Sequence, residues 1–588
     1  WLKQFWLNRC GPCRAFARMV SMEFRGTTAP LELRSTWRFP VSSPPLLPSG
    51  APLAAVAQSG LGKPAVAHAA SSAASSATIS SAISAAATAA AIVGVGRFAS
   101  LLQSKHSRRR RQWLLGFRGA RRHAQILFKK GSDSVRTFVG NSCLPAAAAE
   151  TEVVSPFVSA CSTAQNWEKA VDELVEAAGA GFETGFAFVS EVHLATNTLA
   201  PVLEKLRERL QVRSLVGCAC SGAIGQPCGV AASESTASGL PVEVEGGSVI
   251  SVGLFRETDA TPFFLGADAQ GDVELLQRRA EDGDVKSVLM LSDPFAPADD
   301  ILKKLDDYFP KAVKAGGIAA ALQVGGQERQ AFTPSIGIAA EGCQARLHNQ
   351  GVVGVLLSSM EVHTVVCQGC RGVGPPVKVT SVEGPVCRGI GGRPAQESLQ
   401  LIFSAVSEPD RAKMQQGLTL GLGPAGKGEL TVADGDWLIR GITGVTQDGG
   451  LIVGGGISEG QPMRFHVRDR ESAESDLALM LKRYRLESAF CGSTADPPVG
   501  CLVFTCNGRG ESLYGRPHVD ARTAAEAVGS GPEGTGPLLR GCVAGLFCNG
   551  EIGAPGLALP GDSESLPGSA VHGFTAVFAL LRPCSKGS

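Results

Sequence analysis

A helix pattern between short apolar segments limits the kind of sheet that the middle of this chain can form. From Trp167 to Ala178, apolar side chains recur at three- and four-residue spacing, between Asn166 as a start signal and Gly179 as a stop signal. Strand, helix and strand patterns then follow over residues 186–189, 199–210 and 214–217. A crossover helix brings the second strand back in the same direction, so this order predicts a parallel pair and an α/β fold.

Charge divides the chain into a basic head and an acidic body. The first 130 residues contain 19 Lys and Arg against two acids, Glu23 and Glu32, whereas the remainder contains 36 bases and 52 acids. Neutralising the phosphates of a nucleic acid needs clustered Lys and Arg. The acidic body therefore argues against nucleic acid as a partner.

The head has the composition of a targeting segment. It is rich in Arg, Ser and Ala and nearly free of acids, as transit peptides are. Residues 1–150 are therefore predicted to be a disordered transit peptide that directs the protein to the chloroplast, with the mitochondrion as the alternative. The uncharged stretch Ala65–Gly96 is long enough to span a bilayer, but its Ala and Ser content disfavours a membrane helix.

The rest of the body alternates between helix and strand patterns. Helices are predicted at 298–308, 394–405, 472–485 and 519–528, and strands at 248–255, 352–357, 362–368, 437–445 and 451–453. The last two strands are joined through Gln447-Asp-Gly-Gly450, a hairpin signal. The expected architecture is two lobes with mixed β-sheets flanked by helices, over about residues 160–355 and 356–582.

Small residues follow the first strand–helix–strand unit. Residues 217–225, Gly-Cys-Ala-Cys-Ser-Gly-Ala-Ile-Gly, are predicted to form a loop, and loops after parallel strands are the usual place for ligands. Residues 226–246 are predicted to be a surface insertion.

Seven short motifs in the body resemble FIST N and FIST C domains and occur in the order of that family. They are Gly217-Cys218 with Ile224-Gly225, Ala315-Gly-Gly-Ile318, Gln368-Gly-Cys-Arg371 with Gly374-Pro-Pro376, Phe465-His-Val-Arg-Asp469, Cys506-Asn-Gly-Arg-Gly510, Phe547-Cys-Asn-Gly-Glu-Ile-Gly553 and His572-Gly-Phe-Thr575. They span over two-thirds of the chain, which assigns residues 160–355 to a FIST N domain and 356–582 to a FIST C domain.

The resemblance implies a binding function. The family occurs as sensory modules in bacterial signalling proteins, proposed to bind small ligands such as amino acids, and behind an F-box in eukaryotic ubiquitin-ligase adaptors. We find no Leu-Pro-led F-box pattern upstream of the motifs, which favours the first role. The expected function is therefore a sensory or regulatory module without chemistry of its own, and the alternative is a protein-interaction scaffold of the ligase-adaptor type.

The predicted ligand site follows two apolar strands near the C-terminus. The forked guanidinium of Arg509 suits a ligand carboxylate, and Glu551 suits an ammonium group. The other members of the candidate set lie in the same motifs: Cys506, Asn507, Cys548, Asn549 and His572. Together they would fit an amino-acid-like ligand. The alternative is that Arg509 and Glu551 pair with each other as a structural salt bridge.

A nucleophilic cysteine is a further alternative. Cys506 or Cys548 would form a thiol–imidazole pair with His572 if the fold brought them together. Small cysteines at strand ends are more often core residues, so a cysteine-dependent enzyme has the weaker support. His466, Arg468 and Asp469 lie along a predicted strand and are expected on a solvated face rather than in a site.

Two other motifs resemble a nucleotide site and a metal site, but both are incomplete. We therefore predict no cofactor and no metal. Residues 421–427 match most of a phosphate-binding loop, but Gly428 stands where Ser or Thr is needed, and a hairpin loop is the better account. Cys367 and Cys370 form a CxxC pair, but two further zinc ligands at compatible spacing are absent from the sequence.

Overall fold

The computed structural model describes residues 155–584, apart from gaps at 195–197, 230–238, 267, 269, 321–322, 325–326, 329–334, 425–431, 433–436, 491–496, 530–540 and 560–567. The predicted transit peptide of residues 1–150, including Ala65–Gly96, lies outside the described residues. Within the described part, every helix is too short or too polar to cross a membrane.

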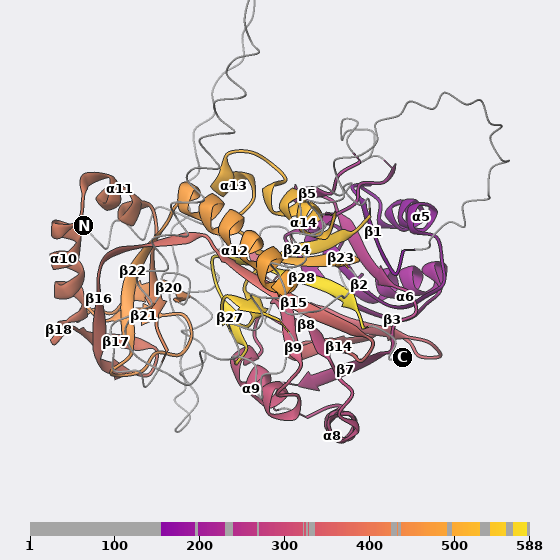
Figure 1. Ribbon diagram of the computed structural model, residues 1–588, viewed down its shortest axis with the longest axis horizontal. Helices are drawn as coiled ribbons and strands as arrows, with labels where there is room; N and C mark the ends of the chain where they lie inside the picture. Colours follow the sequence, from indigo (N-terminus) through magenta and orange to yellow (C-terminus); the bar gives the residue numbers. More distant parts are fainter. Residues whose placement is uncertain are drawn as a thin grey trace, which may run out of the picture. The chain divides into compact units, whose positions relative to one another are not determined.

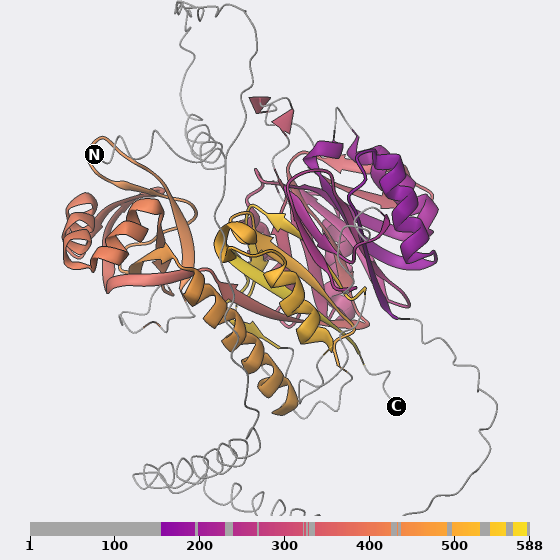
Figure 2. The ribbon, with the colours of Figure 1, turned by 90° about the horizontal axis from the view of Figure 1, so that it is seen from above.

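The first sheet contains the predicted parallel pair. Its strand order is β1 (Phe157–Ser162), β6 (Ile250–Phe255), β2 (Phe182–Ser190), β3 (Val212–Cys220), β12 (Ile336–Ala340) and β13 (Arg346–His348). β2 and β3 are parallel, as the crossover pattern requires. Helices α5 (Trp167–Ala178) and α6 (Leu199–Leu210) pack on β1 and β3 and cover one face of the sheet (Figure 2). The Asn166 side chain caps α5 by accepting from the Lys169 amide at 2.9 Å.

The second sheet joins residues from both halves of the body. Its order is β27 (Ala570–His572), β25 (Glu551–Gly553), β9 (Val313–Ile318), β8 (Ser287–Ser292), β14 (Gly351–Leu357) and β7 (Ala260–Gly266). β8 and β9 are parallel, and helices α8 (Val273–Asp282) and α9 (Ala298–Tyr308) accompany this sheet (Figure 1).

The third sheet also combines distant segments. Its order is β26 (Leu557–Ala558), β15 (Met360–Gln368), β28 (Thr575–Pro583), β23 (Gly500–Cys506), β24 (Val543–Cys548), β4 (Gly222–Gly225) and β5 (Val242–Glu245). β23 and β24 are parallel neighbours. Helices α12 (Arg470–Phe490) and α14 (Val519–Gly529) pack on β15 and β23, and the short α13 (Glu511–Tyr514) contacts α12.

The fourth sheet closes on itself. Its strands are β16 (Cys370–Glu383), β22 (Pro462–Arg468), β19 (Leu418–Leu422), β20 (Leu438–Val445), β21 (Leu451–Val453), β17 (Val386–Ile390) and β18 (Arg393–Pro394). The long strand β16 pairs with β22 in its first part and with β17 in its last part, so six strands form a ring. Helices α10 (Ala395–Ala405) and α11 (Glu408–Gln416) pack beside it, and β16 connects it with the other sheets (Figure 1).

One apolar core unites the first three sheets. It includes Phe186 and Val216 from the first sheet, Leu289 from the second, and Leu502 and Phe504 from the third, all of them fully buried. Burial of this kind is the main favourable contribution to folding. The mixed α/β class with several sheets is therefore confirmed. The two predicted lobes exchange strands, because β4 and β5 lie in the third sheet and β25 and β27 lie in the second.

Two predictions about residues 217–246 are wrong. The predicted loop at 217–225 is almost entirely strand, because β3 continues to Cys220 and β4 begins at Gly222 after a single turn residue. The predicted insertion contains β5, which pairs with β4. These small residues pack inside, since the side chains of Cys218 and Cys220 are completely buried.

The phosphate-loop-like motif begins in a strand. Gly421 belongs to β19, which pairs antiparallel with β20, so the residues between them connect two antiparallel neighbours. This supports the hairpin interpretation over a nucleotide-binding helix; residues 425–431 themselves lie outside the described residues. The predicted hairpin at 447–450 is confirmed by the pairing of β20 with β21.

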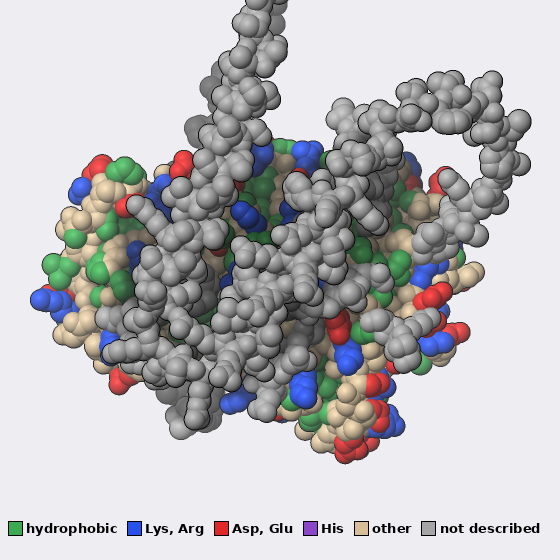
Figure 3. Space-filling view, in the orientation of Figure 1, with side chains coloured by type: hydrophobic (Ala, Val, Ile, Leu, Met, Phe, Trp, Pro, Cys, Tyr) green, Lys and Arg blue, Asp and Glu red, His purple; other side chains and the backbone are tan. Residues whose placement is uncertain are grey.

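Charged side chains of both signs share the surface. Around α8, basic and acidic side chains lie side by side at the lower right of Figure 3. There Arg279 forms an ion pair of 3.1 Å with Asp284 and also lies within 3.9 Å of Asp259. The two carboxylates are exposed, whereas the Arg279 side chain is largely buried.

Candidate functional site

The candidate site lies where β23, β24 and β9 end. Cys506 and Cys548 are the last residues of the parallel strands β23 and β24 and are directly in register. Asn507 and Asn549 follow them, and the Asn507 side-chain amide donates to Oδ1 of Asn549 at 2.6 Å. Nδ2 of Asn549 in turn donates to the carbonyl of Ala319, just past β9, at 3.0 Å. The structure therefore brings these four predicted residues together at one sheet edge.

Glu551 lies directly behind these strand ends and is completely buried. Its Oε2 accepts from the Thr575 amide at 3.1 Å and from the Thr575 hydroxyl at 2.6 Å. The Cys548 thiol lies 3.5 Å from its Oε1. Burial raises the pKa of Glu551 to about 7, although the bonds from Thr575 oppose this change. Both oxygens are thus engaged inside the protein, so Glu551 offers no exposed acceptor to an ammonium group.

His572 is paired with Glu551 through the backbone of β25 and β27. One ring nitrogen, Nε2, lies 3.0 Å from the carbonyl of Gly553, and burial lowers the pKa of the ring to about 4. The second nitrogen, Nδ1, has no hydrogen-bond partner among the described atoms. In the described structure no hydrogen bond joins His572 to Cys506 or Cys548, so the thiol–imidazole pair does not form here.

Arg509 does not face a ligand. Its side chain is 0% exposed, and Nε and Nη2 bind the two oxygens of Asp520 at 2.9 and 3.0 Å. The same Nη2 bonds to the hydroxyl of Tyr514. The forked guanidinium thus binds a carboxylate, as predicted, but that carboxylate belongs to α14. The alternative pairing of Arg509 with Glu551 is also wrong, since Asp520 takes its place.

Arg468 provides a guanidinium that has no carboxylate partner among the described residues. It is the last residue of β22, and it donates to the carbonyl of Gly508. Its Nη2 lies 3.9 Å from the Cys506 sulfur, and its Nε has no hydrogen-bond partner. The side chain is half-buried, and its contacts with Gly508 and Cys506 place the guanidinium at the strand ends. The alternation of the motif alone predicts a solvated face for it.

The two neighbours of Arg468 in the motif are buried elsewhere. His466 packs with its ring 5.7 Å from that of Trp437, against Gly421. Asp469 binds Lys413 and lies 3.4 Å from Arg371. The expectation of a solvated face is therefore wrong for both, because distant charges and aromatic rings that no local pattern reveals surround them.

Phe574 provides an apolar surface beside Arg468. The guanidinium carbon of Arg468 lies 5.1 Å above the ring centroid, within the range of a cation–π contact. The ring packs against Cys370, Trp437 and Ile439. Phe574 has a φ of +63°, a conformation that is rare for a bulky residue and that concentrates at functional sites. The motif His572-Gly-Phe-Thr575 marks this segment, but nothing in the sequence singles out Phe574.

Glycine makes the approach of Arg468 possible. A Cβ atom at position 508 would overlap with Nη1 and Cζ of Arg468. Position 441 is also glycine, and a Cβ there would touch the Phe574 ring at 3.7 Å. Glycine at position 508 therefore leaves room for the guanidinium, whereas 3.7 Å is an ordinary van der Waals distance, so the ring does not require glycine at position 441.

The two cysteines of the CxxC pair lie in different strands. Cys367 lies in β15 and Cys370 begins β16, and both side chains are buried. No group of three or more His, Cys, Asp or Glu side chains is arranged to hold a metal ion within the described part of the chain.

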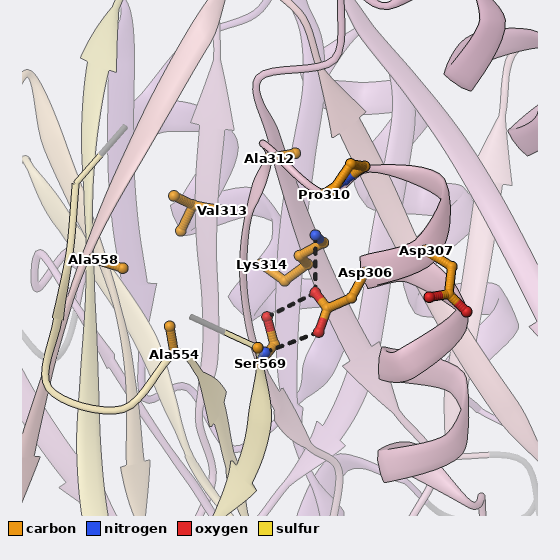
Figure 4. Close-up of a pocket in the computed structure, with 10 residues that line it drawn as sticks. Asp306, Asp307, Pro310, Ala312, Val313, Lys314, Ala554, Ala558 and Ser569 are labelled. Atoms are coloured by element: carbon orange, nitrogen blue, oxygen red, sulfur yellow. Dashed lines mark hydrogen bonds and ion pairs between the residues drawn. The ribbon is translucent and has the colours of Figure 1, made fainter. Parts of the chain in front are cut away.

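A separate cavity of about 200 Å³ lies near the opposite end of β9 (Figure 4). Lys314 forms an ion pair of 2.9 Å with Asp306, whose two oxygens also accept from the backbone and hydroxyl of Ser569. These polar groups satisfy one another. We therefore place the candidate site at the other end of β9, where Arg468 and Asn507 keep unused hydrogen-bonding atoms.

Comparison with known proteins identifies the family. Residues 183–393 match the FIST N domain and residues 396–554 match the FIST C domain. An uncharacterized protein of Mycobacterium tuberculosis is 28% identical over 389 residues, which cover 66% of this chain and 88% of that relative. An uncharacterized protein of Mycobacterium bovis is 29% identical over 432 residues, covering 72% of this chain and 98% of that relative.

The two family matches follow one another and together cover more than half of the chain. The predicted division between residues 355 and 356 stays a prediction. FIST domains are generally associated with sensory signal transduction. The chain belongs to the FIST family and carries a FIST N and a FIST C domain in tandem.

Proposed function

We propose that this protein is a sensory or regulatory module that binds a small, amino-acid-like ligand at the ends of β22, β23 and β24. The observation that carries the proposal is the guanidinium of Arg468, which faces this edge without a carboxylate partner among the described residues. A half-buried guanidinium with free N–H groups favours an anion, and a carboxylate matches its fork.

The remaining groups favour a zwitterion over a simple anion. Oδ1 of Asn507 is buried and has no hydrogen-bond partner among the described atoms. Buried polar atoms are nearly always bonded, so this oxygen favours a ligand donor such as an ammonium group. The Phe574 ring offers an apolar surface for the ligand's side chain. In this proposal Arg468 and Asn507 take the ligand contacts first predicted for Arg509 and Glu551.

We also propose that the site binds its ligand without chemistry of its own. Burial raises the pKa of the Cys548 thiol well above its usual range, so this sulfur is protonated near neutral pH. His572 is engaged with Gly553, and its lowered pKa keeps the ring neutral. This arrangement supports binding rather than nucleophilic catalysis.

The test is a thermal-shift screen of the full chain against amino acids and related metabolites. A ligand present at about 100 times its Kd adds roughly 2.7 kcal/mol to stability, which raises the Tm measurably. The Arg468→Ala variant should lose this stabilisation. Arg470→Ala is the matched control, because Arg470 is exposed and its one ion pair among the described residues is with Glu474, at 3.3 Å.

Two outcomes would contradict the proposal. Stabilisation that persists in Arg468→Ala would place the ligand elsewhere, for instance in the cavity at Lys314. If no metabolite raises the Tm of the folded protein, the alternative of a protein-interaction scaffold is favoured. Affinity capture would then become the next experiment.

A further inference from the structure

Cys506 and Cys548 are neighbours at the ends of β23 and β24, and their chemistry is independent of which ligand the site binds. We propose that Cys506 and Cys548 form an oxidisable pair, in which a peroxide oxidises Cys506 and Cys548 then closes a disulfide between β23 and β24. Nothing in the site's binding role requires this reaction.

The strand register places the two residues within disulfide range. Cys506 and Cys548 are direct partners in the parallel ladder. Neighbouring strands lie about 4.8 Å apart, and partners in register project their side chains to the same face of the sheet. Disulfides join Cα atoms roughly 4.4 to 6.8 Å apart, so the backbone needs no large movement.

The Cys548 sulfur already leans towards β23. Its thiol lies 3.4 Å from the carbonyl oxygen of Thr505, the residue before Cys506. The position opposite is Gly317, where a Cβ atom would come within 3.3 Å of the Cys548 sulfur. The sulfur is thus held between β9 and β23, on the side where Cys506 lies.

Cys506 is the thiol that an oxidant can reach. It is half-buried, whereas Cys548 is completely buried. Burial and the Glu551 carboxylate raise the pKa of Cys506 above its usual value, and the Arg468 guanidinium and backbone bonds from Gly508 and Phe574 limit this rise. A nearby cation stabilises the thiolate, which is the nucleophilic form.

A second close pair of thiols serves as a comparison. The Cys228 thiol lies 3.3 Å from the carbonyl of Cys161, but both side chains are buried. Burial raises the pKa of Cys228, and the Glu173 carboxylate is the charge that raises it most. This pair lacks both the exposure and the cation of the Cys506 pair, so we expect it to stay reduced.

The reaction balances with hydrogen peroxide as the oxidant. The Cys506 thiolate attacks one peroxide oxygen, the O–O bond breaks, and hydroxide leaves and takes up a proton, which gives a sulfenic acid and water. Cys548 loses its proton to the adjacent Glu551 carboxylate and attacks the Cys506 sulfur. The S–S bond forms, the S–O bond breaks, and the departing hydroxide takes a proton to give a second water.

The experiment is peptide mapping of the full chain after peroxide treatment. Remaining thiols are blocked with iodoacetamide, and the protein is digested with chymotrypsin under non-reducing conditions. Cleavage after Phe504 and Phe547 separates the two cysteines into peptides that each carry one thiol. We expect a Cys506–Cys548 cross-linked peptide that is absent before oxidation and disappears on reduction.

Variants distinguish this pair from other thiols. In Cys548→Ser the cross-link is lost completely, and dimedone traps the sulfenic acid on Cys506. In Cys161→Ser the cross-link forms as in the wild type. Cross-linking of Cys161 with Cys228 instead, or accumulation of sulfenic acid on Cys506 of the wild type without a bond to Cys548, would overturn the proposal.

Discussion

Arg509 and Asp520 form a completely buried, two-pronged ion pair between the end of β23 and the start of α14. The contact distances are 2.9 and 3.0 Å, and the Tyr514 hydroxyl lies 3.0 Å from the same carboxylate. Burial opposes ionisation of Asp520, but the guanidinium holds its pKa below the usual value. The pair attaches α13 and α14 to the strand that carries Cys506 and Asn507, and so positions the candidate site without entering it.

Breaking this pair should destabilise the whole domain. Arg509→Met leaves the Asp520 carboxylate buried without its cation, so we expect a loss of about 3–5 kcal/mol in the free energy of unfolding. Urea denaturation of the full chain measures this. Arg470→Met, which removes the exposed pair with Glu474, is the control and should cost less than about 1 kcal/mol. Equal costs in the two variants would refute the anchoring role.

Glu551 should make stability depend on pH. Its pKa is raised from 4.5 to about 7 in the folded protein, so the folded state holds the proton more tightly than the unfolded chain. The contribution of Glu551 is therefore full below about pH 4.5 and is lost as the pH rises through about 7. The expected size of this loss is about 3 kcal/mol.

Glu551→Gln isolates that contribution. Glutamine keeps an acceptor for Thr575 but does not titrate. The free energy of unfolding of the wild type minus that of Glu551→Gln, measured in urea across this pH range, should fall with rising pH. A difference that stays constant would show that Glu551 keeps its ordinary pKa.

Gly508→Ala should abolish ligand binding while it leaves the fold intact. The new methyl group would overlap with the guanidinium of Arg468, which is the end of a flexible side chain and can swing away at little cost. We expect the ligand-induced rise in Tm to vanish, with a change in stability below roughly 1 kcal/mol. Gly456→Ala is the control, since a Cβ atom there meets nothing within 4 Å. Unchanged ligand affinity in Gly508→Ala would argue against Arg468 as the carboxylate contact.

The basic head should act as a targeting segment that directs the protein to the plastid. Residues 1–150 fused to a fluorescent protein are expected to direct it to chloroplasts in plant cells, because the segment is rich in Arg, Ser and Ala and poor in acids. Confocal imaging beside plastid and mitochondrial markers decides between the two organelles. Diffuse cytosolic fluorescence would refute the targeting prediction.

Local sequence determined most of the helices and strands. The helix over Trp167–Ala178 and its cap at Asn166 were predictable because periodicity and capping involve residues only a few positions apart. The parallel pair β2 and β3 followed from the crossover helix between them. The motifs after residue 500 also predicted that the candidate residues lie at the ends of two strands, since carboxyl ends of parallel neighbours meet at one edge.

Only the tertiary structure decided which charged side chains face the ends of β23 and β24. Arg509 and Arg468 both stand in recognisable motifs, but Asp520 neutralises one and no described carboxylate neutralises the other. Local sequence could not predict that residues 222–225 form a strand, because β4 forms by pairing with β24, more than 300 residues away. The partner of a buried charge or an edge strand comes from a distant segment, and residue order alone carries no record of which segment that is.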